Sequence, residues 1–152
     1  MHRLLWLIAG TTALTPVFSL ADPLPTGGTV VKGDVAIATP GTTQMTITQR
    51  SDRAVVNWNS FSIGRGAHVD IRQPSQDSAI LNRVTGSTDS QIHGRLTANG
   101  QVHLVNPNGI FIGRTGIVDS GAFVGSTLDT TDEDFTAGRL RYSGNGTSKT
   151  VE

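Results

Sequence analysis

Residues 101–112 read Gln101-Val102-His103-Leu104-Val105-Asn106-Pro107-Asn108-Gly109-Ile110-Phe111-Ile112, with a strand-like run on either side of a tight turn. Pro107 has the fixed φ that the first central position of a type I turn requires, Asn108 tolerates the second position, and Gly109 can take the positive φ that follows. The Asn106 side chain can bond to the backbone ahead of it. This stretch therefore predicts a strand, a turn and a second strand.

Short β-prone runs separated by turn residues continue along the whole chain. Glycine accounts for 18 of 152 residues and only 16% of residues are charged, which is typical of turn-rich β structure. The runs follow one another at a spacing of roughly 8–12 residues. They lie at 29–31, 45–47, 54–56, 61–63, 68–71, 79–81, 91–92, 101–105, 110–112, 116–118 and 122–124.

Two architectures fit this spacing. One is an antiparallel sandwich or barrel, and the other is a β-solenoid, in which short strands stack in parallel sheets. An apolar-Gly-polar corner recurs around Gly64, Gly94 and Gly113, and small residues at corners suit a tightly wound coil. Strict repetition is absent, so these residues alone leave both architectures open. One helix is expected over residues 132–137, capped by Thr131 and ended at Gly138.

The N-terminus has the three-part pattern of a cleavable secretion signal. A positively charged start is followed by the apolar run 4–14 and by small residues at Ser19 and Ala21, the positions that signal peptidase reads. The run is too short to span a bilayer core of about 30 Å. We therefore expect residues 1–21 to be a signal peptide, rather than a membrane anchor or a core segment, cleaved between Ala21 and Asp22 after passage through the inner-membrane secretion machinery.

Composition limits the partners of the remaining chain. Removing Arg3 with the signal leaves 11 Lys and Arg against 12 Asp and Glu, so the formal charge is −1. No strong positive field is available to attract nucleic acid, and no nucleic-acid partner is expected. The chain has no cysteine, so packing must hold it together where many exported domains use disulfides. The mature length of about 130 residues fits one domain.

No residue pattern points to catalysis. His68, His93 and His103 lack the spacing of metal ligands, and no serine occupies a Gly-x-Ser-x-Gly elbow. The adjacent carboxylates at 132–134 suit the first turn of a helix better than the carboxylate pair of a polysaccharide-cleaving enzyme. We expect no catalytic residue, no metal site and no cofactor.

Several stretches in a fixed order resemble one family. They are 25–28, 46–49, 55–64, 73–75, 79–86, 90–102, 104–110 and 123–129. Together they resemble the N-terminal secretion domain, also called the TPS or haemagglutination activity domain, of filamentous-haemagglutinin-type two-partner secretion exoproteins. The resemblance covers about residues 24–144. It implies an all-β fold, a right-handed parallel β-helix (β-solenoid) with short extra-helical strands or hairpins.

The resemblance also implies a function. Such a domain targets the chain for secretion in Gram-negative bacteria and nucleates its folding. It is recognised in the periplasm by the periplasmic modules of an outer-membrane β-barrel transporter. The chain would then be secreted or displayed at the cell surface. Full-length relatives are adhesins, haemagglutinins or toxins, and contact with a host-cell surface would come through a C-terminal region absent here.

Two hallmark segments of the family map onto this chain. The first comprises Asn106, Pro107, Asn108, Gly109 and Ile110, expected to serve transporter recognition or folding. The second follows Leu81 and comprises Asn82, Arg83, Val84, Thr85 and Gly86. An Asn-Pro-Asn-Leu hallmark of some members has no match. The resemblance is lost near the end, so we divide the chain into a signal (1–21), a secretion domain (22–144) and a tail of uncertain structure (145–152), a possible truncation point.

Individual side chains also have structural interpretations. We expect Trp58 and Phe61 to be core or cap aromatics, the asparagines 57, 59, 82, 106 and 108 to form internal polar ladders or turn brackets, and Arg83 to be solvated on the coil surface. Two other functions remain as alternatives: a surface adhesin or carbohydrate-binding domain acting directly, and a polysaccharide-active β-helix enzyme. Aromatic residues make up only 5% of the chain, which gives the first alternative little support.

Overall fold

The computed structural model describes residues 10, 23–144 and 150–152. The expected cleavage site at Ala21 and Asp22 lies outside the described residues. The strands are β1 (Thr29–Lys32), β2 (Val35–Ala38), β3 (Gln44–Gln49), β4 (Arg53–Trp58), β5 (His68–Arg72), β6 (Ala79–Val84), β7 (Ser90–Ile92), β8 (Arg95–Ala98), β9 (Gln101–Val105), β10 (Ile110–Ile112), β11 (Ile117–Asp119) and β12 (Ala122–Ser126), and the helix is α1 (Asp132–Thr136).

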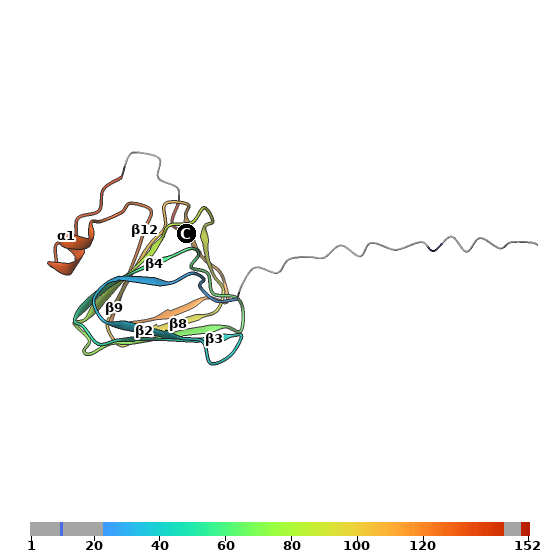
Figure 1. Cartoon of the computed structure of the whole chain (residues 1–152). Helices are drawn as coiled ribbons and strands as arrows, with labels where there is room; N and C mark the ends of the chain where they lie inside the picture. Colours follow the sequence, from blue (N-terminus) through green and yellow to red (C-terminus); the bar gives the residue numbers. More distant parts are fainter. Residues whose placement is uncertain (1–9, 11–22, 145–149) are drawn as a thin grey trace, which may run out of the picture.

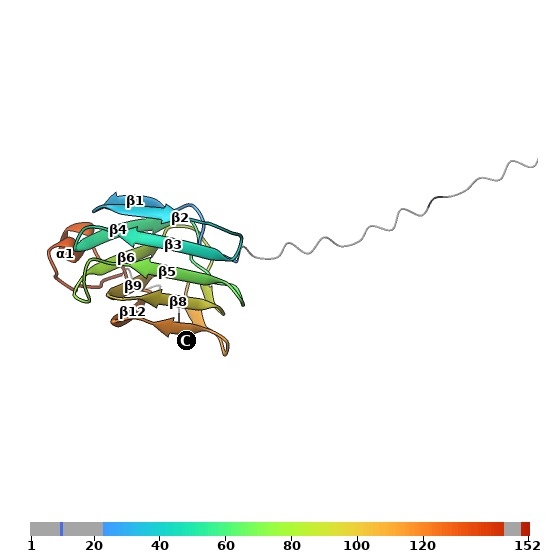
Figure 2. The same ribbon diagram turned by 90° about the horizontal axis from the view of Figure 1, so that it is seen from below.

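The chain winds as a coil with three faces. On the first face β4, β6, β9 and β12 are parallel neighbours, and on the second β3, β5, β8 and β11 are. The third face is short: β7 pairs with β10, and single parallel bridges join Ile63 to Ile92 and Ile110 to Val151. Figure 1 looks along the coil, and Figure 2 shows its rungs stacked one below another. The expected parallel β-helix is confirmed, and the antiparallel sandwich is excluded.

Two consecutive antiparallel strands cover the first rung, one on each of its two long faces. β1 runs antiparallel to β4, and β2 runs antiparallel to β3 (Figure 2). The turn between them contains Gly33 at φ +84°, a left-handed conformation that favours glycine. β1 and β2 provide the extra-helical strands expected of the fold and cap one end of the coil.

The core consists of apolar side chains stacked in register from rung to rung. Met45, Val69 and Leu96 form one such row on the second face, and all three are buried. Trp58 and Phe61 are also buried and meet edge to face with ring centroids 5.5 Å apart, which confirms that they are core aromatics. Because each fully buried Val, Leu or Ile contributes about 1.5–3 kcal/mol, these rows supply stability without disulfides.

A ladder of buried amides holds the corner between the second and first faces. Gln73 Nε2 donates to Gln49 Oε1 at 3.1 Å, and Gln49 Nε2 donates to the carbonyl oxygen of Ala79 at 3.1 Å. Gln73 Oε1 accepts from the Gly100 backbone N–H at 2.9 Å. The ladder thereby ties three successive rungs in one register.

An outer strap, residues 127–144, leaves the coil after β12 and crosses the outer side of the first face (Figure 1). It contains α1, which forms as predicted: Thr131 caps its start by accepting from the Asp134 N–H at 3.1 Å, and Gly138 beyond it has φ +77°. Phe135 of α1 is buried against Val55, Leu81 and Val105. The first face is therefore buried on both sides.

Candidate functional site

The turn over residues 106–110 has the predicted geometry. The Asn106 carbonyl oxygen accepts from the Gly109 N–H at 3.1 Å, and Gly109 has φ +118°. Asn106 Oδ1 also accepts from the Asn108 backbone N–H at 2.9 Å. These bonds close the turn from within.

The two asparagines of the turn also hold the loop of the preceding rung. Asn106 Nδ2 donates to the Thr88 carbonyl oxygen at 3.0 Å and to Ser90 Oγ at 2.9 Å, and Asn108 Nδ2 donates to the Gly86 carbonyl oxygen at 2.8 Å. Asn106 has 0% exposure. Both ends of its amide are satisfied, as a buried polar group requires, so this side chain serves as a bracket between rungs.

The second hallmark segment, 82–86, meets the first at that bracket. Gly86 lies against the preceding rung so closely that an added Cβ would overlap the Asn59 carbonyl oxygen. The Thr85 N–H donates to the Trp58 carbonyl oxygen at 2.8 Å, and Asn82 Oδ1 accepts from Trp58 Nε1 at 3.0 Å inside the core. The structure thus brings the two segments together, and most of their side chains point into the fold.

Arg83 is not solvated on the coil surface as the sequence predicts. Its side chain is only 13% exposed and is held by the outer strap: Nε donates to Asp129 Oδ1 at 2.8 Å, Nη1 to Asp132 Oδ1 at 2.8 Å and Nη2 to the Thr130 carbonyl oxygen at 2.6 Å. Burial alone would lower the pKa of Arg83, but the bonds to the two carboxylates outweigh it and raise the pKa. The prediction of a solvated arginine was wrong because the strap covers this part of the first face.

His103 lies beneath the same strap. Its Nδ1 is 2.5 Å from the Tyr142 hydroxyl, and its ring meets Phe135 edge to face. Burial, assisted by the charge of Arg53, lowers the pKa of His103 to about 4. The imidazole is therefore neutral at neutral pH.

We expect acid to destabilise the fold through His103. In the unfolded chain its pKa is near 6.5, so between pH 6.5 and 4 the unfolded state binds the proton first and stability falls as pH falls, by about 2–3 kcal/mol at pH 4.5. Urea unfolding at pH 7 and 4.5 measures this loss. In His103→Gln, which keeps a partner for Tyr142 but does not titrate, the loss should be smaller by that amount; an equal loss in both proteins would contradict the assignment.

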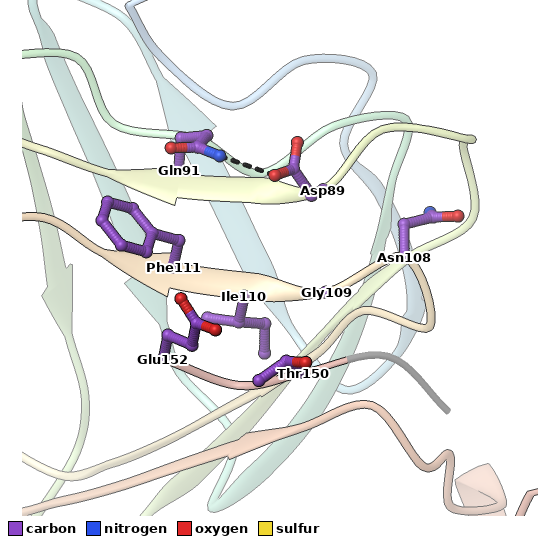
Figure 3. A pocket seen from close by; sticks show the side chains of 8 residues that line it. All are labelled: Asp89, Gln91, Asn108, Gly109, Ile110, Phe111, Thr150 and Glu152. Carbon is purple, nitrogen blue, oxygen red and sulfur yellow. Dashed lines mark hydrogen bonds between the residues drawn. The ribbon is translucent and has the colours of Figure 1, made fainter. Parts of the chain in front are cut away.

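A surface hollow of about 310 Å³ adjoins the turn (Figure 3). It is lined by Asn108, Gly109 and Ile110 of the turn, together with Asp89, Gln91, Phe111, Thr150 and Glu152. Gln91 Nε2 donates to Asp89 Oδ2 at 2.6 Å, and Phe111 is exposed at the surface. Only the outer edge of the turn therefore faces solvent.

Neither a metal-binding cluster nor a membrane-spanning helix extends the site within the described residues. No group of three or more His, Cys, Asp and Glu is placed to hold a metal ion within the described chain. No helix in that part of the chain is long and apolar enough to cross a membrane.

Comparison with known proteins gives consistent results. The family model of the TPS secretion domain matches residues 21–151. Two heme/hemopexin-binding proteins of Haemophilus influenzae are 38% and 37% identical over 140 and 123 residues, which is 92% and 81% of this chain. The chain spans only 15% and 13% of their lengths.

A solved structure agrees in sequence and in fold. The crystal structure of the HMW1 secretion domain from Haemophilus influenzae matches with a TM-score of 0.71 and 39% identity, covering 74% of this chain and 30% of that one. The family is a secretion domain and not an enzyme family. Its members are secreted through the outer membrane to the cell surface or beyond, with an outer-membrane transporter as partner. The four-rung parallel coil, the hallmark segments bracketed within it and these matches together mean that the chain belongs to the TPS secretion domain family.

Proposed function

We propose that the transporter reads the segment 106–110 in the unfolded chain, and that the same residues then nucleate the coil outside the cell. The observation that supports this order is the burial of Asn106 and its cross-rung bonds to Thr88 and Ser90. In the folded domain its amide has no hydrogen-bonding capacity left for a partner. Before folding, the segment is free to add as a strand to a sheet edge of the transporter, where backbone bonds give affinity and side chains give specificity.

Folding outside the cell favours outward movement of the chain through the transporter. Each rung that stacks buries another row of apolar side chains, such as Met45, Val69 and Leu96. Burial of these apolar rows makes the folded coil more stable than the unfolded chain inside the transporter. The folded rungs then oppose return of the chain through the transporter.

The test compares two ways of damaging the domain. Replacing Asn106 and Asn108 with alanine alters the segment 106–110 itself. Gly94→Ala leaves that segment unchanged but damages folding, because an added Cβ would overlap the carbonyl oxygens of Gly64 and Ala67. We expect the double asparagine variant to remain in the periplasm. We expect Gly94→Ala to be released but to be cleaved by protease. Fractionation followed by limited proteolysis measures both, with Gln76→Ala, an exposed loop change, as the control that behaves as wild type.

Release of the asparagine variant as a protease-sensitive product would contradict recognition of the segment. That outcome would leave a folding role alone. Retention of both damaged variants would also contradict the proposal, because it would mean that export senses folding and not the segment.

Further parts of the proposal concern processing and partners. We propose cleavage by signal peptidase between Ala21 and Asp22, which N-terminal sequencing of the exported chain would test. We propose that the domain has no catalytic role and no nucleic-acid partner. We also propose that contacts with a host surface belong to regions outside this domain. The boundary at residue 144 stays a prediction, although the family match to residue 151 and the pairing of Val151 with Ile110 support an association of residues 150–152 with the coil.

The main alternative, a domain that binds carbohydrate directly, has less support. Trp58 and Phe61 are buried in the core and offer no stacking surface to a sugar. A glycan-binding assay of the purified chain separates this alternative from the secretion role.

A further inference from the structure

The corner between the third and second faces carries an arginine on each of three stacked rungs. Its backbone layers are bonded directly: the Arg95 N–H donates to the Ala67 carbonyl oxygen at 2.9 Å, and the Ile117 N–H donates to the Gly94 carbonyl oxygen at 2.9 Å. Arg65, Arg95 and Arg114 all belong to this corner, and all three are exposed. Arg95 lies in register with His68 and Ile117, and Arg65 and Arg114 each lie three residues before those positions. The three arginines are therefore gathered at one corner without being stacked on one another.

Nearby carboxylates do not neutralise this corner. None of its three arginines takes part in an ion pair within the described chain. Asp70 on β5 is engaged by Arg72 at 3.0 Å and by the Thr97 hydroxyl at 2.8 Å. Asp119 of β11 sits beside Thr97 in the register, two positions along the strands from Arg95. The corner therefore keeps a local excess of positive charge in a chain that is close to neutral.

A hollow of about 190 Å³ lies at this corner. Its polar lining comes from Arg65, His68, His93, Arg95 and Thr115, and no carboxylate lines it. The His68 ring is fixed, because Thr97 Oγ1 donates its proton to Asp70 and so accepts from His68 Nε2 at 2.7 Å. Thr115 Oγ1 donates to the His93 carbonyl oxygen at 2.7 Å. The walls are therefore ordered, and the two guanidinium groups provide the charge.

We propose that this corner binds a tetrahedral oxyanion, a phosphate or sulfate group, between Arg65 and Arg95. A guanidinium presents a planar fork of donors that matches two oxygens of such a group. Two forks from successive rungs can engage different oxygens of one anion. The hollow leaves room beside the anion for part of the molecule that carries it. This inference is independent of transporter recognition, because it concerns the folded domain and residues outside both hallmark segments.

The test is a titration of the purified chain at low ionic strength, where exposed charges are least screened. The probes are inorganic phosphate, sulfate and glucose 1-phosphate, with glucose as the uncharged control. Binding is followed by the amide NMR signals of Gly66 and Gly94, which line the hollow. We expect saturable shifts with all three anions and none with glucose. Tighter binding of glucose 1-phosphate would indicate a sugar-linked group as the source, and equal binding would indicate the free anion; both outcomes support the site.

Charge-removing variants locate the site. Arg65→Gln and Arg95→Gln should each weaken binding at least about threefold, the size of one exposed ion pair, and the double variant should abolish the shifts. Arg50→Gln removes an exposed arginine that pairs with Asp34 at a different corner of the coil, between β3 and β4, and it should leave the dissociation constant within about twofold of wild type. Absence of saturable shifts in wild type, or equal weakening by Arg50→Gln, would overturn the proposal.

Discussion

Replacing Gly86 with alanine should lower the free energy of unfolding by about 3 kcal/mol or more, at the upper end of the cost of overpacking. The added Cβ would overlap the Asn59 carbonyl oxygen, which is backbone and cannot move aside as a flexible side chain can. Removing the overlap would require Gly86 to move away from Asn59. That movement would disturb the hydrogen bond that Asn108 Nδ2 donates to the Gly86 carbonyl oxygen. Urea unfolding followed by circular dichroism measures the change.

The matched control is Gly41→Ala. Nothing lies within 4 Å of a Cβ built at Gly41, so the same chemical change should alter stability by less than about 0.5 kcal/mol. Comparable stability of Gly86→Ala and Gly41→Ala would mean that the rungs at Gly86 can relax. In that case the glycine of the second hallmark segment would have no role in spacing the coil.

Replacing Phe135 with alanine should cost about 3–5 kcal/mol, the range for truncating a buried phenylalanine. Phe135 fills the space between the outer strap and the first face, touches Val55, Leu81 and Val105, and lies 5.6 Å from the Arg53 guanidinium carbon. Without the ring, the strap keeps its bonds to Arg83 but loses its apolar contact. We therefore expect both lower global stability and faster proteolysis within residues 127–144.

Leu140→Ala provides the comparison, because Leu140 is on the same strap but is 54% exposed. It should change stability by less than about 0.5 kcal/mol. If Phe135→Ala speeds cleavage of the strap while the unfolding free energy stays at the wild-type value, then the strap docks independently and does not stabilise the coil. That result would contradict the expected cost.

The features that the sequence predicts well are those that short-range stereochemistry determines. The turn at 106–110 follows from Pro107 and Gly109, and the cap of α1 follows from Thr131, since each involves residues within a few positions of one another. The strand expected at 61–63 is an exception. It makes only a parallel bridge at Ile63, because the third face is too short at that rung to pair further.

The features that the sequence does not predict are non-local. Arg83 meets Asp129 and Asp132 only because the outer strap returns across the coil, and no local pattern signals that return. The amide ladder of Gln49 and Gln73 depends on rungs of unequal length coming into register. The strands β2 and β8 are not predicted, because both contain alanine, which has low β-propensity: it makes up two of the four residues of β2 and one of the four of β8. The sequence indicates where the two hallmark segments lie, and the structure shows the hydrogen bonds that they make between rungs.

The cap formed by β1 and β2 makes the two ends of the coil unequal. Its outer strands are short, and β1 has an irregular register between Val30 and Lys32. Bulges and lysines of this kind prevent another strand from pairing at an edge. At the opposite end, β11 and β12 are edge strands without a further neighbour in the described chain. A filament of copies joined head to tail needs two complementary open ends. The coil therefore has a growth polarity: β11 and β12 continue the parallel order of the rungs, whereas β1 and β2 run antiparallel to it, and this difference opposes head-to-tail joining of copies.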